Sequence, residues 1–236
     1  MSIESKNGSG IPRILHQIWL GPRKPPWRWL RSVERMHSGW EYHLWTEGNL
    51  PPLHNQRAFD RSPSWHQKSD VLRYEILWRY GGVYVDADCE ALRPLDPLLG
   101  SAGGLFAGYE GSTADPGLIA SGVIGCAPHH PLMRVLIDEL DIERDGHAWE
   151  IAGPLYFTEA IRKTSPHADI HPAHYFYPIH HRDRWPLYFG VSRRDPRLAN
   201  SYFMHHWGST TDRFLPWPRR LARRLRYAVE NRRRSS

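Results

Sequence analysis

The chain has 236 residues, 40% of them hydrophobic and 24% charged, a composition that excludes an intrinsically disordered polymer. This length fits one large domain with short appendages. The formal charge of +6 is concentrated at one end: residues 213–236 contain nine Arg and one Glu, a balance of +8, so residues 1–212 carry −2. A near-neutral body without a basic stripe argues against nucleic acid as a partner.

Three further features bear on the class of protein. Residues 1–10 are polar and predict a flexible leader rather than a signal peptide, because they lack an apolar run. The chain contains no stretch of 18 apolar residues, so no transmembrane helix is predicted. The two cysteines, Cys89 and Cys126, are too few for a disulfide framework, and we expect buried free thiols. Together these features favour a cytoplasmic protein.

The hydrophobic pattern of residues 11–212 predicts strands and helices that alternate along the chain. In chain order these are a strand at 11–20, a helix at 25–36, a strand at 41–45, a helix at 69–80, strands at 83–85, 104–109 and 121–126, and helices at 131–140 and 154–163. Such alternation is typical of an α/β fold, in which a mostly parallel central sheet is flanked by helices.

Two aspartates, Asp86 and Asp88, follow the apolar strand 83–85. Residues two apart in an extended chain face the same side, so both carboxylates are expected at one point beyond the strand. Ligands of open α/β sheets bind outside the carboxyl ends of strands. Paired carboxylates suit Mg²⁺ or Mn²⁺, which can bridge a diphosphate and stabilise its charge as it leaves. Glu90 continues the alternation, as a third contact or as a surface residue.

Two segments resemble a known family: Ile11-Pro-Arg-Ile-Leu-His-Gln-Ile-Trp19, and the block from Ser69-Asp70-Val-Leu-Arg73 through Val-Tyr84-Val-Asp86-Ala-Asp88. With weaker matches at 93–96, 125–131, 153–154 and 205–207, the chain resembles the Asp-x-Asp sugar-binding glycosyltransferases of family 32, relatives of yeast-type α-mannosyltransferases and of the glucosylating bacterial toxins. The resemblance implies a GT-A fold over 11–212, a UDP- or GDP-hexose donor, a carbohydrate or glycolipid acceptor, Mn²⁺ or Mg²⁺, and transfer with retention at the anomeric carbon.

The resemblance also implies roles for individual residues. Carried over by position, Trp19 stacks on the nucleotide base, Asp70 and Arg73 hold the donor sugar and diphosphate, Tyr84 lies near the ribose or phosphate, and Asp86 and Asp88 lie at the ribose and metal. A Trp offers a flat apolar face, and residues three apart on a helix share one side. The alternatives are a core role for Trp19 and a surface ion pair for Asp70 and Arg73.

Three residues near the later strands complete the expected site. Ser121 stands near the position where the family often has Asn, and it is the candidate substitute for that donor contact. The resemblance puts His206 where relatives have a metal- or phosphate-facing polar residue, so it is the candidate metal ligand or phosphate contact, and an imidazole can complete a Mn²⁺ shell. Trp207 is a candidate donor contact. The sequence leaves open which of His205 and His206 faces the site.

Retention requires either a carboxylate nucleophile or a front-side attack in which the leaving phosphate takes the acceptor proton. Glu110, after the predicted strand 104–109, is the candidate nucleophile or acceptor contact. His167 and His171 have the spacing of zinc ligands on a helix, but Pro166 and Pro172 argue against a helix there. We expect these two histidines to be surface or loop residues.

The Arg-rich segment 213–236 predicts a basic amphipathic helix, with Trp217, Leu221, Leu225 and Val229 recurring every four residues. This pattern is typical of peripheral binding to an anionic membrane surface, here its inner face, although a helix packed on the body is the alternative. A dehalogenase-type phosphatase also uses Asp-x-Asp, but it needs a later Gly-Asp that this chain lacks. A non-catalytic membrane- or polyanion-binding protein is the other alternative.

Overall fold

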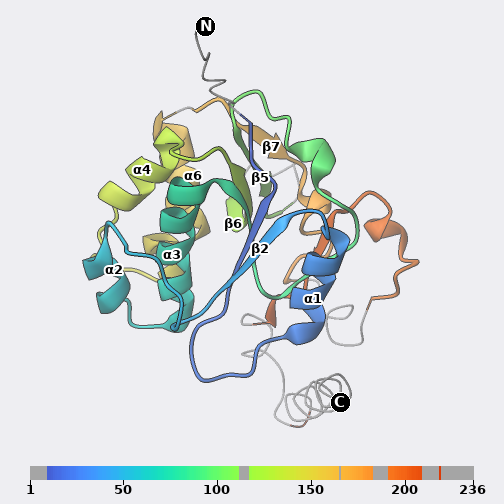
Figure 1. Ribbon diagram of the computed structural model, residues 1–236, viewed down its shortest axis with the longest axis horizontal. Coiled ribbons are helices and arrows are strands. Elements are labelled where there is room, and N and C mark those ends of the chain that lie inside the picture. The colour runs from blue at the N-terminus through green and yellow to red at the C-terminus, as the bar shows by residue number, and fades with distance from the viewer. Residues whose placement is uncertain (1–9, 112–116, 165, 183–190, 209–217, 219–236) are drawn as a thin grey trace, which may run out of the picture.

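The computed structural model describes residues 10–111, 117–164, 166–182, 191–208 and 218 (Figure 1). The central sheet has the strand order β2-β1-β3-β6-β5-β7. Its strands are β1 (Ile14–Ile18), β2 (Glu41–Trp45), β3 (Gly82–Val85), β5 (Leu105–Tyr109), β6 (Ile119–Cys126) and β7 (Asp169–His171). The predicted leader before residue 10 and the amphipathic tail after 212, apart from Pro218, lie outside the described residues.

Helices cover both faces of this sheet. They are α1 (Trp27–Met36), α2 (Gln56–Arg61), α3 (Trp65–Tyr80), α4 (Pro131–Asp138), α5 (Ala148–Ile151) and α6 (Pro154–Thr164), with short 3₁₀ turns at Asp96–Leu98, Ala173–Tyr175 and Pro196–Leu198. Figure 1 shows α2, α3, α4 and α6 on one side of the sheet and α1 on the other. A second, two-stranded sheet pairs β4 (Cys89–Ala91) with β8 (Phe203–His205).

The alternation of side chains along the strands divides the interior into two cores. In β3, Val83 and Val85 pack in the core that also contains Val33 of α1, whereas Tyr84 packs in the core beneath α3, α4 and α6. The polypeptide therefore forms a layered α/β sandwich with the sheet in the middle. Both cysteines are buried free thiols, as predicted.

The sheet is mostly parallel, as predicted, but β6 is an exception. β1 pairs in parallel with β2 and β3, and β5 with β7, whereas β6 is antiparallel to both β3 and β5. A connection too short for a crossover joins β5 to β6, and such a connection favours antiparallel pairing. Among the described residues, no helix is both long enough and apolar enough to cross a bilayer.

Helix α3 starts at Trp65, four residues before the predicted start at Ser69. Ser64 caps it, its side chain accepting a hydrogen bond from the backbone N–H of Gln67. The helix lacks a one-sided apolar stripe, because Asp70, Arg73 and Glu75 are buried together with its apolar residues.

Sequence patterns did not predict the short elements α2, α5, β4, β7 and β8, which contain three to six residues.

Candidate active site

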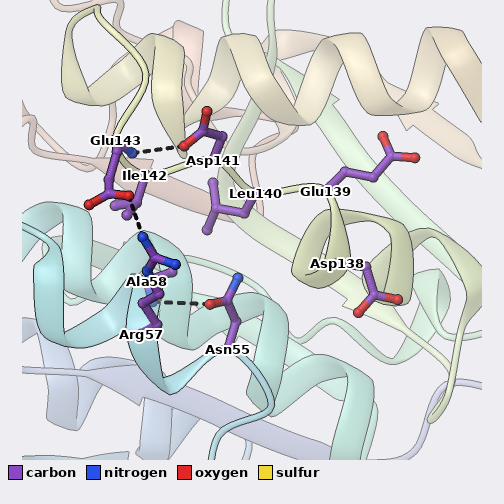
Figure 2. A pocket seen from close by; sticks show the side chains of 9 residues that line it. All are labelled: Asn55, Arg57, Ala58, Asp138, Glu139, Leu140, Asp141, Ile142 and Glu143. Atoms are coloured by element: carbon purple, nitrogen blue, oxygen red, sulfur yellow. Dashed lines mark hydrogen bonds and ion pairs between the residues drawn. The ribbon is translucent and has the colours of Figure 1, made fainter.

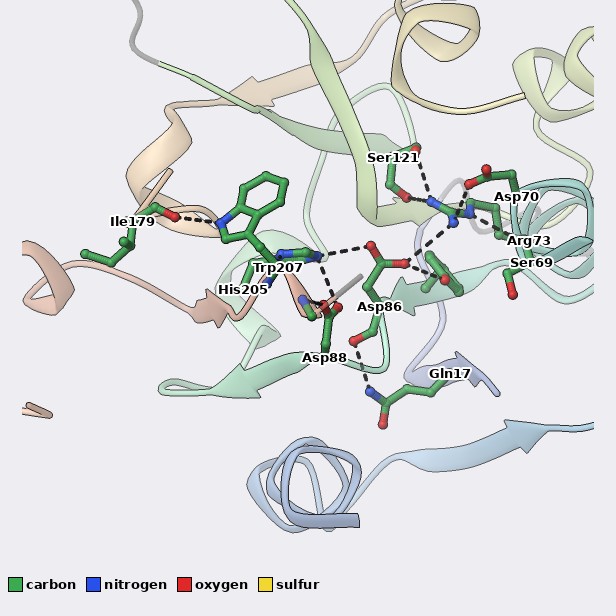
Figure 3. A network of polar contacts seen from close by, with 12 residues as sticks. Gln17, Ser69, Asp70, Arg73, Asp86, Asp88, Ser121, Ile179, His205 and Trp207 are labelled. Carbon is green, nitrogen blue, oxygen red and sulfur yellow. Dashed lines mark hydrogen bonds and ion pairs between the residues drawn. The ribbon is translucent and has the colours of Figure 1, made fainter. Parts of the chain in front are cut away.

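The carboxyl end of β3 positions Asp86 through backbone and side-chain hydrogen bonds. The backbone N–H of Asp86 donates to the Gly122 carbonyl of β6 at 2.8 Å. The hydroxyl of Tyr84 donates to Asp86 Oδ1 at 2.6 Å. The backbone N–H of Cys89 donates a hydrogen bond to the Asp86 carbonyl at 3.0 Å. This bond closes a tight turn that contains Asp88. The turn brings both predicted aspartates to the end of β3 (Figure 3).

The second sheet brings residues more than a hundred positions later next to Asp88. In the β4–β8 pair, Cys89 lies opposite His205. Asp88 Oδ2 accepts a hydrogen bond from the backbone N–H of Gly208 at 2.6 Å, and the Asp88 carbonyl accepts one from that of His206 at 3.0 Å. The backbone of a segment near the C-terminal end of the chain therefore holds the Asp88 carboxylate in place.

The imidazole that faces the aspartates belongs to His205. Its Nε2 lies 3.3 Å from Asp86 Oδ2 and 3.2 Å from Asp88 Oδ1, while its Nδ1 accepts a hydrogen bond from the backbone N–H of Trp207 (Figure 3). Burial lowers the pKa of His205, but the Asp88 and Asp86 carboxylates outweigh burial and raise the pKa above its ordinary value.

The prediction of His206 as a metal ligand is wrong in this structure. His206 Nε2 lies 3.2 Å from Glu90 Oε2, and its ring stacks on Trp29 of α1 with centroids 4.2 Å apart. Successive residues of an extended chain point in opposite directions, so only one of two adjacent histidines can face Asp88. The structure selects His205.

Glu90 is neither a surface residue nor a third ligand. It is buried and accepts a hydrogen bond from Arg193 at 2.7 Å in addition to its contact with His206. Burial alone would raise its pKa, but His206, Arg193 and Arg28 lower the pKa to about 2. Glu90 therefore remains ionised in an ion-pair network next to the site.

Asp70 and Arg73 form a buried ion pair on α3, so the surface-pair alternative is wrong. Arg73 Nη2 lies 2.6 Å from Asp70 Oδ1 and 3.6 Å from Asp86 Oδ1. Arg73 Nη1 donates to the carbonyl of Ser121 at 2.6 Å and to its Oγ at 2.9 Å. The guanidinium also lies over the Tyr84 ring, 4.6 Å from its centroid. One buried cation thus joins α3, β3 and β6.

Burial and this shared cation move the two carboxyl pKa values apart. Burial raises the pKa of Asp70 to about 7, against the opposing effect of Arg73. Burial also acts on Asp86, but Arg73, His205 and Tyr84 together hold its pKa below the ordinary value. Asp86 therefore loses its proton at a lower pH than Asp70 does.

Tyr84 and Ser121 contact the charged residues of the site, and the donor contacts predicted for them stay predictions. Both side chains are buried, and their polar atoms are engaged by Asp86 and Arg73. Trp207 is also buried, and its Nε1 donates to the carbonyl of Ile179 at 2.7 Å. Trp19 is half-buried immediately after β1. The nucleotide contact of Trp19 and the donor contact of Trp207 stay predictions.

Two family models match separate parts of the chain, and each part includes residues of the site. One is described as a glycosyltransferase sugar-binding region containing a DXD motif and matches residues 28–103, which include Asp70, Arg73, Asp86 and Asp88. The other is described as an alpha 1,4-glycosyltransferase conserved region and matches residues 125–225, which include His205. The chain belongs to the DXD glycosyltransferase family. The predicted family is confirmed.

Curated relatives of this DXD glycosyltransferase include eukaryotic enzymes. Inositol phosphoceramide mannosyltransferase 1 of Schizosaccharomyces pombe is 32% identical over 162 residues, which are 64% of this chain and 48% of the relative. The alpha-1,4-N-acetylglucosaminyltransferase of Homo sapiens is 26% identical over 171 residues, 65% of this chain and 46% of the relative. The chain spans about half the length of these two relatives.

Solved structures share the fold of this DXD glycosyltransferase at low sequence identity. The PaToxG glycosyltransferase aligns with a TM-score of 0.52 and 16% identity, covering 66% of this chain and 70% of its own. The UDP-bound glycosyltransferase domain of the YGT toxin aligns with a TM-score of 0.50 and 8% identity, covering 69% of this chain and 80% of its own. The predicted GT-A fold is confirmed.

The DXD glycosyltransferase also contains a buried hydroxyl group that sequence reasoning missed. Tyr177 is buried, and within the described part of the chain its hydroxyl has no hydrogen-bond partner. A Cβ atom placed on Gly122 would lie 2.5 Å from Asp86 Oδ2 and 3.0 Å from Tyr177 Oη. Gly122 thus keeps open a space that both polar groups border. No motif marks Tyr177, because only the fold brings it to Asp86.

The donor set at the DXD turn fits a divalent cation. Ligand atoms of Asp88 and His205 belong to one group within 4.8 Å of one another, and Asp86 contacts the same imidazole. Carboxylate oxygens and an imidazole nitrogen are suitable ligands for Mn²⁺. The thiol of Cys89 belongs to the same group, but burial raises its pKa well above the ordinary value, so it stays protonated at neutral pH.

A pocket on the α2 side of the glycosyltransferase lies apart from these residues. It is lined by Asn55, Arg57, Ala58 and residues 138–143, and an ion pair of 2.6 Å between Arg57 and Glu143 crosses it (Figure 2). None of the predicted site residues lines this pocket.

Proposed function

We propose that this chain is a divalent-metal-dependent retaining hexosyltransferase that uses a UDP- or GDP-hexose donor and a hydroxyl acceptor on a carbohydrate or glycolipid. The observation that carries the proposal is the convergence of Asp86, Asp88 and His205 at the carboxyl end of β3. Arg73 also favours the proposal, because its charge helps to keep Asp86 ionised.

Asp88 and His205, with Asp86 beside them, are the residues that would hold Mn²⁺ or Mg²⁺. The bound ion would supply positive charge to the diphosphate as its negative charge grows. The low pKa of Asp86 means that its carboxylate is available without a prior loss of a proton at neutral pH. Binding through His205 Nε2 requires the imidazole to release the proton that it shares with the two carboxylates.

In the transfer, the bond between the anomeric carbon and the diphosphate oxygen breaks, and its electron pair leaves with the nucleoside diphosphate. The acceptor oxygen forms the new bond on the same face, and its proton passes to the leaving phosphate oxygen. Trp19, half-buried after β1, is the proposed contact for the base. This front-side scheme uses no protein nucleophile, and the carboxylate of Glu110 is instead engaged by His180 and His181.

The names of the relatives support the acceptor class. One relative is named for mannosyl transfer to inositol phosphoceramide, a glycolipid acceptor, and another for an alpha-1,4 linkage. An alpha product from an alpha-linked donor corresponds to retention. We also propose that residues 213–236 bring the enzyme to an anionic membrane surface on the cytoplasmic side, because their Arg-rich apolar repeat has the composition of such segments.

Hydrolysis of soluble donor tests the proposal. UDP- and GDP-sugars are incubated with the enzyme and either Mn²⁺ or a chelator, and release of nucleoside diphosphate is measured. We expect turnover only with metal and its loss in Asp88→Asn. Asp138→Asn is the matched control, because Asp138 is an exposed aspartate paired with Arg134 on α4. Metal-independent turnover by Asp88→Asn would overturn the assignment of the site.

A further inference from the structure

A second group of metal-ligating side chains lies at the end of β5. Glu110 directly follows this strand, and its Oε1 lies 3.5 Å from His181 Nδ1 and 3.7 Å from His180 Nε2. One ligand atom from each of the three residues lies within 4.8 Å of the other two. None of the three belongs to the Asp88 and His205 group.

These separations suit metal ligands better than hydrogen bonds. An N–H···O hydrogen bond has a donor–acceptor distance of about 2.7–3.2 Å, shorter than either contact of Glu110. Two ligands on a tetrahedral zinc ion, each bonded at about 2.0–2.1 Å, stand about 3.4 Å apart. Both separations between Glu110 and the imidazoles are therefore close to the distance between two ligands of one ion.

The nitrogen that His181 turns toward Glu110 is buried and lacks a hydrogen-bond partner in the described part of the chain. A buried polar atom without a partner is energetically unfavourable. A cation would satisfy this nitrogen.

Trp207 forms an apolar wall beside the group. Its ring centroid lies 5.1 Å from that of His181, 5.8 Å from that of His180 and 4.3 Å from that of His205. The same indole thus lies beside both clusters of metal-ligating residues.

We propose that Glu110, His180 and His181 bind one transition-metal ion of the Zn²⁺ class, separate from the ion at Asp88. Two imidazoles and a carboxylate are a ligand set that zinc accepts, and three protein ligands leave one coordination position for water or a hydroxyl oxygen. Coordination through His180 Nε2 places the remaining proton on Nδ1. The present 3.2 Å hydrogen bond from the backbone N–H of Arg182 to that nitrogen must therefore be released.

Binding would join the end of β5 to a segment about 70 positions later in the chain. An ion that binds only the folded protein stabilises it. Zinc should therefore leave two signatures that do not depend on glycosyl transfer: a defined stoichiometry and a rise in melting temperature.

Zinc titration of the metal-free full chain against a fluorescent chelator tests the proposal. All variants carry Asp88→Asn, which weakens the other site. We expect this parent protein to bind one equivalent of Zn²⁺ and its Glu110→Gln and His181→Ala derivatives to bind none. His174→Ala is the matched control, because His174 is an exposed histidine outside the group, and it should still bind one equivalent.

Circular dichroism and melting curves accompany the titration, with Zn²⁺ expected to raise the melting temperature of the parent and the control only. If Glu110→Gln does not fold, Glu110→Asp decides, because it keeps a carboxylate on a shorter side chain and should weaken zinc binding by at least about tenfold. Equal zinc stoichiometry in parent, cluster variants and control would overturn the proposal, as would unchanged affinity in Glu110→Asp or no zinc binding by the parent.

Discussion

Arg73 is the residue on which the polar network of the site depends. Its guanidinium contacts Asp70, Ser121 and Asp86 and lies over the ring of Tyr84. Because the cation is shared between two carboxylates, it does not compensate fully for the burial of both. The consequence is that Asp86 keeps a low pKa, whereas the pKa of Asp70 rises to about 7.

The raised pKa of Asp70 predicts a pH-dependent stability. From the ordinary value of 3.8 up to about 7, the unfolded chain loses this proton while the folded protein keeps it. The contribution of Asp70 to the free energy of unfolding therefore falls as pH rises through this range and is constant above it. Urea denaturation of the wild type and Asp70→Asn at about pH 5 and about pH 8 measures this. The wild type should lose stability relative to Asp70→Asn at the higher pH. An unchanged difference between the two proteins would contradict the assignment.

The hydrogen bond from Tyr84 to Asp86 predicts a second residue effect. Tyr84→Phe removes a 2.6 Å hydrogen bond to an ionised group, so we expect weaker Mn²⁺ binding and a loss of about 1–3 kcal/mol in stability. Tyr156→Phe is the matched control, because that hydroxyl donates to the Leu136 carbonyl in the helical layer. Calorimetric Mn²⁺ titration should separate the two variants, whereas equal metal affinity would show that Tyr84 does not position Asp86.

At the scale of elements, the antiparallel strand β6 shapes the site as much as β3 does. Its Gly122 carbonyl binds the backbone of Asp86, and its Ser121 carbonyl and hydroxyl bind Arg73. The β4–β8 pair then brings His205 to the same place. Three chain segments with wide separations in sequence are therefore held in register by backbone pairing, which orients the polar side chains before any ligand binds.

Gly122→Ala tests the role of β6. The added methyl group would stand 2.5 Å from Asp86 Oδ2, so the carboxylate must move. We expect Mn²⁺-dependent donor hydrolysis to fall by at least about tenfold, since small displacements of catalytic groups are costly. Gly100→Ala is the control, because a Cβ atom there meets nothing within 4 Å. Full activity of a correctly folded Gly122→Ala protein would contradict the role assigned to this glycine.

At the scale of the whole molecule, charge and catalysis are separated along the chain. Residues 1–212 carry a formal charge of −2 and contain the site, whereas residues 213–236 carry +8. The sheet divides the body into two apolar cores, and the site lies where the end of β3 meets the second sheet. The basic segment therefore has the charge for binding an anionic membrane surface, as proposed. The turn with Asp86 and Asp88 has the charge for binding a metal ion.

Deletion of residues 219–236 tests this separation. It removes eight of the nine Arg of the terminal segment, each worth about 1 kcal/mol near an anionic leaflet. We expect less cosedimentation with phosphatidylserine vesicles and unchanged hydrolysis of soluble donor. Phosphatidylcholine vesicles are the control. Equal vesicle binding by the truncated protein would remove the membrane proposal, and vesicle binding without any donor hydrolysis would favour a non-catalytic binding protein.

The sequence by itself determined the fold class, the family and the two aspartates, because these depend on short-range patterns. The pattern places Asp86 and Asp88 directly after a strand, although a turn closed by the Cys89 N–H, rather than extended alternation, brings them together. Helical spacing pairs Asp70 with Arg73. It also predicted most of the longer elements to within a few residues, from β1 to α6. Short elements such as β4 and β8 have three residues each and carry no periodic signal.

Only the tertiary structure decided which polar groups complete the site. His205 rather than His206 faces the aspartates because β8 pairs with β4 in one register, across more than a hundred residues. The same long-range packing brings the hydroxyl of Tyr177 to Asp86 and places His180 and His181 beside Glu110. Local periodicity specifies which face of its own element a side chain occupies, whereas the neighbour across that face depends on how distant strands and loops pack.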